Sequence, residues 1–410
     1  MSEPIDPSVQ PGKKILGFAI PRLNRHEISG SLGDLGTFIP LLVGMSITNG
    51  LDFTSALFFA GLFNIVTGIM FSIPMAVQPM KAIAAIAISE NLRLEQILAA
   101  GISTSVIILF IGATRLIVIV DRVIPKPVIR GLQLGLGLQL IEKGVQLIRD
   151  THILWGFDSI AVGILGFAII LAFASSKKIP SALVVFVIGL SLAVAMKVDV
   201  LRTLTVGINL PHWVPLTWDD FRSSLFRAAL PQIPLTTLNS VIAVCALSAD
   251  LFPNRQARPR KVAVSVGLMN ILGGWFGAMP MCHGAGGLAG QYRFGARTNA
   301  SILFLGTIKL LLAVFFGSSL LTLLRVYPKS ILGVLLSISG LELALVARDQ
   351  SGRGAATVTL TTAGAMLALG NTATGFAIGW ILALIFEWHP RGQSEEDRHE
   401  GKGDHTANND

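Results

Sequence analysis

Charged residues are scarce in this chain of 410 residues, because Asp, Glu, Lys and Arg together make up only 14% of it. Hydrophobic residues make up 52%, and the mean hydropathy is +0.67. An average soluble domain has about 25% charged residues. The composition therefore excludes a soluble globular protein and predicts an integral membrane protein with most of its mass in the bilayer.

Cysteine and the sequence motifs of hydrolases are also largely missing. The two cysteines, Cys245 and Cys282, lie in apolar runs, so we expect neither a disulfide framework nor a metal site. No H-E-x-x-H or Walker sequence occurs. Adjacent residues on a helix point about 100° apart, so Cys282 and His283 would make a poor nucleophile–base pair. We therefore expect no enzyme activity and no cofactor.

The two ends of the chain lack long apolar runs. The first 27 residues have no signal-peptide core, so we expect 1–27 to be a cytoplasmic N-terminal segment. The polar stretch 390–410 is expected to be a disordered cytoplasmic tail. The net charge of +8 does not predict a nucleic-acid partner, because the cations lie mainly in short breaks between apolar runs, where they orient the helices.

Apolar runs near the length of a spanning helix, about 20 residues, recur through the rest of the chain. They predict fourteen candidate spans near 29–48, 54–72, 74–89, 95–120, 124–148, 156–174, 179–197, 226–248, 261–277, 280–297, 299–320, 329–347, 355–369 and 371–388. The third and tenth are short or rich in glycine, so twelve is the alternative number. Lys and Arg are concentrated in the even-numbered breaks, which predicts that both termini are cytoplasmic.

An internal duplication is visible between the two halves. "GLFNIVTGIMFSIPM" at 61–75 matches "GLMNILGGWFGAMPM" at 267–281 at seven positions without a gap, an offset of 206 residues. The alternative, a chance likeness of two glycine-rich helices, does not explain the matching asparagines and prolines. An odd number of spans separates the copies, which predicts two inverted repeats of seven spans over 28–215 and 216–389, as in many secondary transporters.

Each copy places proline between a full span and a short helical run. Proline breaks a helix, so we expect an extended entry followed by a helix that starts near Gln78 in one copy and near Gly284 in the other. Because the copies are inverted, these short helices, spans 3 and 10, should meet with their N-termini near the midplane. Two free helix N-termini make an anion site. Helix packing is the alternative role for the glycines, as in "GLQLGLG" at 131–137.

Polar and glycine residues in or beside these breaks are the candidate site residues. The predicted substrate-binding residues are Thr37, Gln78, Lys81, Gln232, Thr236, Asn239, His283, Gly284, Gly286 and Gln291. Gln78 is expected to donate directly to the anion. Asp34 and Glu342 are candidates for carrying a coupling proton. Three structural alternatives stay open: Asp34 could fix local backbone, Lys81 could only snorkel, and His283 could be a hydrogen-bonded core residue.

Four strings, "GDLGTFIP", "PMAVQPMKAIAA", "PQIPLTTLNS" and "MCHGAGGLAGQYRFGART", resemble the molybdate transporter family, whose relatives are the sulfate permeases. The resemblance runs from about 29 to 388. It implies a core domain of spans 1–4 and 8–11 that holds the substrate and a gate domain of spans 5–7 and 12–14. The tail after Trp388 has no apolar pattern, so we do not expect the soluble C-terminal domain that is common in sulfate permeases, and this argues against an ordinary sulfate permease.

The expected function is therefore secondary active import of molybdate by alternating access, coupled to an ion gradient, with a proton as the expected ion. Physical reasoning alone supports only a small anion, so the alternative is a transporter of sulfate or another small anion with the same fold. The other expected partner is membrane lipid, and a homodimer through the gate domain is left open. The expected location is a bacterial inner membrane.

Overall fold

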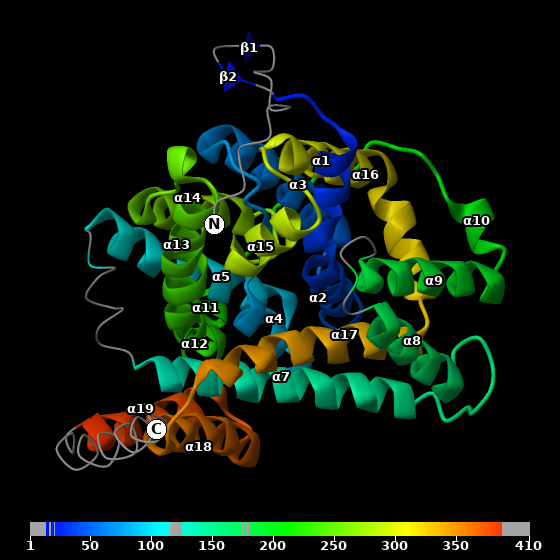
Figure 1. Ribbon diagram of the computed structural model, residues 1–410. Helices are drawn as coiled ribbons and strands as arrows, with labels where there is room; N and C mark the ends of the chain where they lie inside the picture. Colours follow the sequence, from blue (N-terminus) through cyan, green and yellow to red (C-terminus); the bar gives the residue numbers. More distant parts are fainter. Residues whose placement is uncertain are drawn as a thin grey trace, which may run out of the picture.

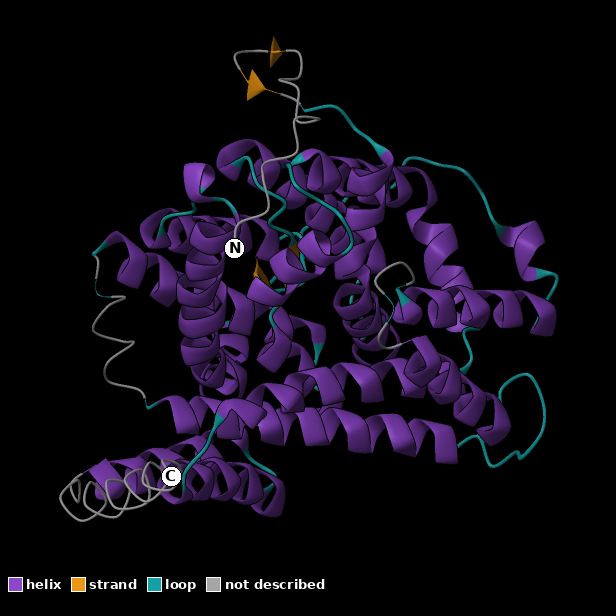
Figure 2. Cartoon of the chain, viewed as in Figure 1, coloured by secondary structure: helices purple, strands orange, loops and turns teal. Residues whose placement is uncertain are grey.

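The computed structural model describes residues 14–15, 18–19, 21–114, 116, 125–173, 176 and 180–387. Figures 1 and 2 show that this part of the chain is almost entirely helical, as the sequence predicts. The predicted tail over 390–410 and the parts of the predicted spans that fall within 117–124 lie outside the described residues. Most of the predicted N-terminal segment also lies outside them.

The first half of the described chain contains two short strands near the N-terminus, one strand before α4, and a series of helices. The elements are β1 (Lys14–Ile15), β2 (Phe18–Ala19), α1 (Arg25–Ser31), the 3-10 turn η1 (Leu32–Asp34), α2 (Leu35–Asn49), α3 (Phe53–Phe71), β3 (Val77–Pro79), α4 (Lys81–Glu90), α5 (Leu94–Ala113), α7 (Lys126–Arg149), α8 (Ile160–Phe173), α9 (Ser181–Met196) and α10 (Val200–Thr203).

The second half has one strand and includes two π-helical turns, η2 and η3. Its elements are α11 (Trp218–Ser224), η2 (Leu225–Ala229), α12 (Leu230–Leu235), η3 (Thr236–Ile242), α13 (Ala243–Leu251), the 3-10 turn η4 (Pro253–Arg255), α14 (Pro259–Gly274), β4 (Met281–His283), α15 (Ala285–Arg293), α16 (Ala300–Arg325), α17 (Lys329–Ala344), the 3-10 turn η5 (Leu345–Asp349), α18 (Arg353–Leu369) and α19 (Thr372–Glu387).

Several helical stretches suit a bilayer by length and composition. Among the described residues, six are long and apolar enough to cross a membrane: Arg25–Asn49, Phe53–Phe71, Leu94–Ala113, Trp218–Leu251, Ala300–Gly317 and Lys329–Asp349. Three shorter apolar helices are Ile160–Phe173, Ser181–Met196 and Thr372–Phe386. These lengths agree with a membrane protein but do not confirm the predicted number of fourteen spans.

The helices form two groups. In the first, α7 and α17 pack side by side, α18 and α19 lie against α7, and α8 and α9 lie against α17. In the second, α3 packs on α16 and α5 packs on α14. Figure 1 shows α7, α17, α18 and α19 along the bottom of the view, with the short helices α4 and α15 inside the group above them.

The packing partners follow the internal offset of 206 residues. At this offset α3 corresponds to α14 and α5 corresponds to α16. The equivalent of the contact between α3 and α16 is therefore a contact between α14 and α5, and both contacts are present. α7 corresponds to α17, and these two helices pack on one another. Two copies related by a pseudo-two-fold axis would produce this pattern of contacts.

Both proline segments are extended and then helical, as the sequence predicts. α3 ends at Phe71, and its C-cap residue Ser72 has a left-handed backbone with φ of 57°. Pro74 comes two residues later and cannot continue the helix. β3 then precedes α4, and β4 precedes α15 in the second copy. The predicted helix starts were near Gln78 and Gly284, and the observed helices start at Lys81 and Ala285.

The two extended segments meet as an antiparallel pair. Val77 lies opposite His283, and these residues are equivalent at the offset of 206. Asn64 Oδ1 accepts a hydrogen bond from the Val77 N–H at 2.8 Å, and Asn270 Oδ1 accepts one from the Met281 N–H at 2.7 Å. The asparagines that match between the copies therefore hold the backbone of the two strands in place.

Candidate functional site

A cavity of about 220 Å³ lies where β3, α4, α12, η3, β4 and α15 face α7, α17 and η5. Each group of helices contributes to its wall, because Gln133 of α7 and Leu343 of α17 line it together with residues of the broken helices. One water fills about 30 Å³ of liquid. The cavity therefore has room for a small oxyanion and a few waters.

Six of the ten predicted substrate-binding residues line this cavity. They are Gln78, Lys81, Gln232, Asn239, Gly284 and Gly286. The other lining residues were not predicted, and they are Pro79, Gln133, Leu235, Ser240, Cys282, Ala285, Leu343 and Val346. The sequence therefore points to the cavity itself but to only part of its wall.

The remaining predicted residues lie outside the cavity wall. Thr37 is half-buried on α2, and Thr236 is buried and hydrogen-bonded to Gln232. His283 is fully buried, with Nε2 at 3.1 Å from Ser265 Oγ and its ring edge-on to Phe71, which fits the structural alternative for this residue.

Gln291 and Glu342 differ in their surroundings. Gln291 is buried on α15, and its Oε1 accepts a hydrogen bond from Ser301 Oγ at 2.8 Å. Glu342 is exposed on α17, between the buried Leu343 and the exposed Leu341. Neither residue contacts the cavity, although Leu343 beside Glu342 does line it.

Gln78 faces the cavity with its amide oxygen. Its Nε2 donates a hydrogen bond to Oδ1 of Asp34, which is buried behind it in η1. A Cβ on Gly284 would overlap Gln78 Oε1, so Gly284 leaves the space that this oxygen occupies. The expected direct donation from Gln78 to an anion is therefore not the orientation seen here, where its donor group is bonded to Asp34.

Gln232 closes the N-terminus of α4. Its Oε1 accepts hydrogen bonds from the N–H groups of Ala82 at 2.9 Å and Ile83 at 3.2 Å, and its Nε2 donates to Thr236 Oγ1 at 2.8 Å. The prediction of two free helix N-termini is therefore wrong for α4, because Gln232 already accepts hydrogen bonds from its first N–H groups. Sequence reasoning missed this, since the cap comes from a residue 150 positions away.

The N-terminus of α15 is different. Its N-cap residue is Gly284, and in the part of the chain that the structure describes no side chain accepts from the first N–H groups of this helix. A Cβ on Gly286 would lie 4.0 Å from Lys81 Nζ, so the lysine ammonium lies beside this helix end. Backbone donors and one cation thus meet at the cavity, an arrangement that suits an anion.

Gln133 adds a donor from the opposite wall. Arg130 Nη1 donates to Gln133 Oε1 at 3.0 Å, while the same guanidinium pairs with the Asp349 carboxylate of η5 at 2.5 to 3.0 Å. This bond holds the amide oxygen toward Arg130, and the Gln133 Nε2 group is the donor that this cavity residue can offer to an anion. A glutamine within the apolar "GLQLGLG" was the available signal, but the segment was interpreted as a packing surface.

A buried lysine also went unnoticed. Lys309 of α16 is only 3% exposed, and its Nζ lies 3.4 Å from the centre of the Phe38 ring. The charges of Lys309 and Lys81 both act on the Asp34 carboxylate. A lysine in the apolar run "GTIKLLLAVFF" is the kind of intramembrane charge that signals function, so the sequence contained the information.

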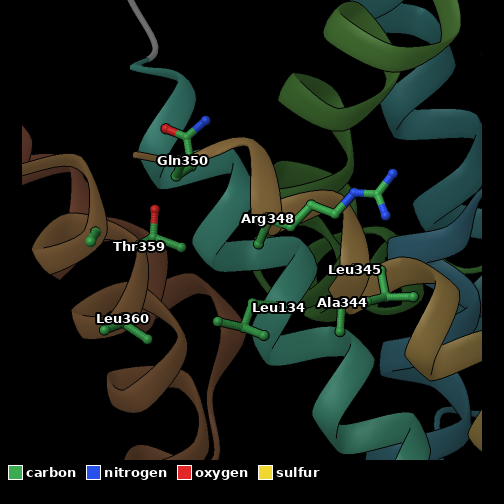
Figure 3. A pocket seen from close by; sticks show the side chains of 9 residues that line it. Leu134, Ala344, Leu345, Arg348, Gln350, Thr359 and Leu360 are labelled. Atoms are coloured by element: carbon green, nitrogen blue, oxygen red, sulfur yellow. The ribbon is translucent and has the colours of Figure 1, made fainter. Parts of the chain in front are cut away.

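A second cavity, of about 360 Å³, lies between α7, η5 and α18. Figure 3 shows Leu134, Leu345 and Leu360 among the side chains around it, with Arg348 extending away from Thr359 and Leu360. None of the predicted site residues lines this cavity. Its wall offers an anion far fewer converging donors than the cavity at Gln78.

Comparison with known proteins gives consistent similarities. The family model described as molybdate transporter of MFS superfamily matches residues 26–140 and 224–343. Molybdate transporter 2 of Arabidopsis thaliana is 42% identical over 88% of this chain and 87% of its own length. Molybdate transporter 1 of Chlamydomonas reinhardtii is 36% identical over 88% of this chain and 91% of its own length.

Solved structures show the fold. The transmembrane domain of a cyanobacterial bicarbonate transporter, BicA, superimposes with a TM-score of 0.62 at 15% identity, covering 88% of this chain and 97% of that one. The anion transporter murine Slc26a9 superimposes with a TM-score of 0.64 at 14% identity, covering 92% of this chain and 69% of that one. At this level of identity, the similarity shows a shared architecture.

Proposed function

The chain belongs to the molybdate transporter family, and we propose that it carries molybdate across a membrane by alternating access coupled to an ion gradient. The family consists of transporters, so enzymatic activity is not expected. The observation that supports the substrate most directly is the cavity at Gln78, where backbone N–H groups of α15, the Lys81 ammonium and the Gln133 amide converge. These donors suit a compact oxyanion.

The architecture that we propose is two inverted repeats over 28–215 and 216–389, with fourteen spans. The reciprocal contacts α3–α16 and α5–α14 support it, as does the strand pairing centred on Val77 and His283. In this proposal the core is spans 1–4 and 8–11, which contain α2, α3, α4, α5, α12, α13, α14, α15 and α16. The group containing α7, α8, α9, α17, α18 and α19 is the gate.

Alternating access is proposed because the cavity lies between these two groups. Gln133 and Leu343 would move with the gate, whereas Gln78, Lys81 and Gly286 would stay with the core. A rocking of one group against the other would then open the cavity to one side of the membrane at a time. Both cytoplasmic termini, a bacterial inner membrane and a homodimer through the gate stay predictions.

For the coupling ion we propose a proton carried by Asp34. This carboxylate is buried and bonded to Gln78, a cavity residue, whereas the alternative Glu342 is exposed and is not among the residues that line the cavity. A proton on Asp34 would therefore change the charge beside the substrate. For Glu342 as the proton carrier, no hydrogen bond to a cavity residue is found among the described residues.

Uptake into proteoliposomes tests the proposal. Labelled molybdate should accumulate when the outside is more acidic than the inside, and accumulation should collapse when a protonophore is added. Excess tungstate, which has nearly the same size and charge, should compete strongly, and sulfate should compete less. Accumulation of sulfate but not of molybdate would support the alternative substrate. An absence of both would refute the proposed function.

A further inference from the structure

Gln78 connects a buried carboxylate to the substrate cavity. Its amide has two ends with opposite hydrogen-bonding character: Nε2 donates to Asp34 Oδ1, and Oε1 lies on the Gly284 side, at the cavity. An ionised carboxylate can only accept hydrogen bonds, so it fixes the amide in this orientation. In this state the residue presents an acceptor to the cavity, which disfavours an anion.

Protonation of Asp34 would reverse this orientation. A protonated carboxyl can donate its O–H, and the matching acceptor on Gln78 is Oε1. Rotating the terminal amide by half a turn exchanges Oε1 and Nε2 within almost the same volume, and this torsion has a broad, two-fold preference. After the rotation, Oε1 accepts from Asp34 and Nε2 faces the cavity as a donor.

We propose that the Gln78 amide is the switch that couples proton binding at Asp34 to oxyanion binding in the cavity. The proposal rests on the proposed function and specifies how its coupling works. One proton is taken from water and bonded to a carboxylate oxygen of Asp34, and no other bond is made or broken. Asp34 is thus a positioning residue, because it acts on the substrate through Gln78.

Other charged and titratable groups also lie around Asp34. Lys309 and Lys81 act on the carboxylate from α16 and α4, and the Cys282 thiol lies near it on β4. Two helices packed against η1 also carry charged residues. On α1, the Glu27 carboxylate accepts hydrogen bonds from the backbone N–H groups of Arg297, Thr298 and Ser301. On α15, Arg293 is exposed.

Neutralising Asp34 removes a negative charge that acts on Lys309 and Lys81. Lys309 Nζ makes no hydrogen bond among the described residues and rests against the Phe38 ring. Its charge then adds to the positive potential that a dianion meets at the cavity. Proton and anion therefore favour each other's binding, and by linkage the effect is reciprocal.

Calorimetry on the purified full-length protein tests the inference. Molybdate binding is measured in two buffers of different ionisation enthalpy, over a pH range in which molybdate stays a dianion. We expect proton uptake on binding, and an affinity that falls on the alkaline side by about tenfold per pH unit, the slope of one linked proton. No proton uptake by the wild type would overturn the inference even if molybdate binds well.

Asp34→Asn gives the sharper arm, because the Asn amide can donate to Gln78 Oε1 as the protonated carboxyl does. This variant should bind molybdate with a pH-independent affinity, take up no proton, and exchange molybdate without accumulating it. The infrared band of a protonated carboxyl should appear on molybdate binding to the wild type and be missing from Asp34→Asn. Wild-type pH dependence in this variant would overturn the inference.

Two further variants separate the amide switch from a general charge effect. The loss of affinity in Gln78→Leu should shrink as the pH rises in the wild-type background and be independent of pH in the Asp34→Asn background. The matched control Glu342→Gln should keep the proton uptake, and its loss there would move the proton site to Glu342. Failure of the wild type to bind any oxyanion would instead refute the proposed function.

Discussion

Gln133 provides the most direct test of the cavity, because it is the donor on the α7 wall and sequence reasoning did not select it. Replacing Gln133 with Leu removes the Nε2 donor while keeping a side chain of similar volume. Arg130 loses one acceptor but keeps its pairing with Asp349, so the local structure should persist. The change therefore isolates one hydrogen bond to the substrate.

A hydrogen bond to a charged group contributes about 1.5 to 3 kcal/mol, so the affinity for molybdate should fall by about 10- to 150-fold. Calorimetric titration of the purified variant measures this. Gln139→Leu is the matched control, because Gln139 lies on the same helix, is also buried, and is not among the residues lining the cavity. Wild-type affinity in Gln133→Leu, or an equal loss in Gln139→Leu, would refute the assignment of the α7 wall.

The remaining predictions concern glycines and the two lysines. Gly284→Ala should abolish molybdate binding, because its Cβ would overlap Gln78 Oε1. Gly286→Ala should lose less affinity, because its Cβ would lie 4.0 Å from Lys81 Nζ. Equal affinities of the two variants in calorimetry would contradict this. Gly131→Ala should lower the yield of folded protein in size-exclusion chromatography, because its Cβ would lie 2.7 Å from the backbone oxygen of Thr359. The control is Gly364→Ala, whose Cβ would have no atom within 4 Å. Lys81→Met should insert normally and bind molybdate more weakly, and unchanged binding would show that Lys81 only snorkels. Lys309→Met should also weaken binding while leaving the cavity wall intact, and a thermal-shift assay with and without molybdate would separate this effect from a loss of stability.

The broken helices and their position could be predicted because their signals are local. Pro74 and Pro280 each follow the end of a long helix, and the repeat places both at the same point of their copies. The cavity could be predicted for the same reason, since extended backbone in an apolar chain has to line a cavity or be buried.

The side-chain partners could not be predicted, because they depend on contacts between distant elements. Gln232 is polar and lies beside a proline in the sequence, but only the fold shows that its oxygen caps α4. The orientation of the Gln133 amide depends on Arg130, which Asp349 of η5 holds from the far end of the chain. Lys309 was detectable as a lysine in an apolar run, although its proximity to Asp34 was not.

The duplication also explains why the two broken helices are chemically unequal. At the offset of 206, Gln78 of one copy corresponds to Gly284 of the other, and both lie next to the strand pair centred on Val77 and His283. In the proposed arrangement of two inverted repeats, these equivalent positions lie near the pseudo-two-fold axis, where their side chains would compete for one space. Gln78 fills that space, and Gly284 is the residue that leaves it free.

This competition turns a symmetric scaffold into an asymmetric site. One copy provides a glutamine that reaches Asp34, and the other provides a helix N-terminus without a side chain in the way. Exchanging the two residues, as Gln78→Gly with Gly284→Gln, should keep the volume at the axis but remove the bond to Asp34. Such a double variant is expected to fold better than Gly284→Gln alone and to lose the pH dependence of molybdate binding. Retained pH dependence would show that Asp34 acts on the anion without Gln78.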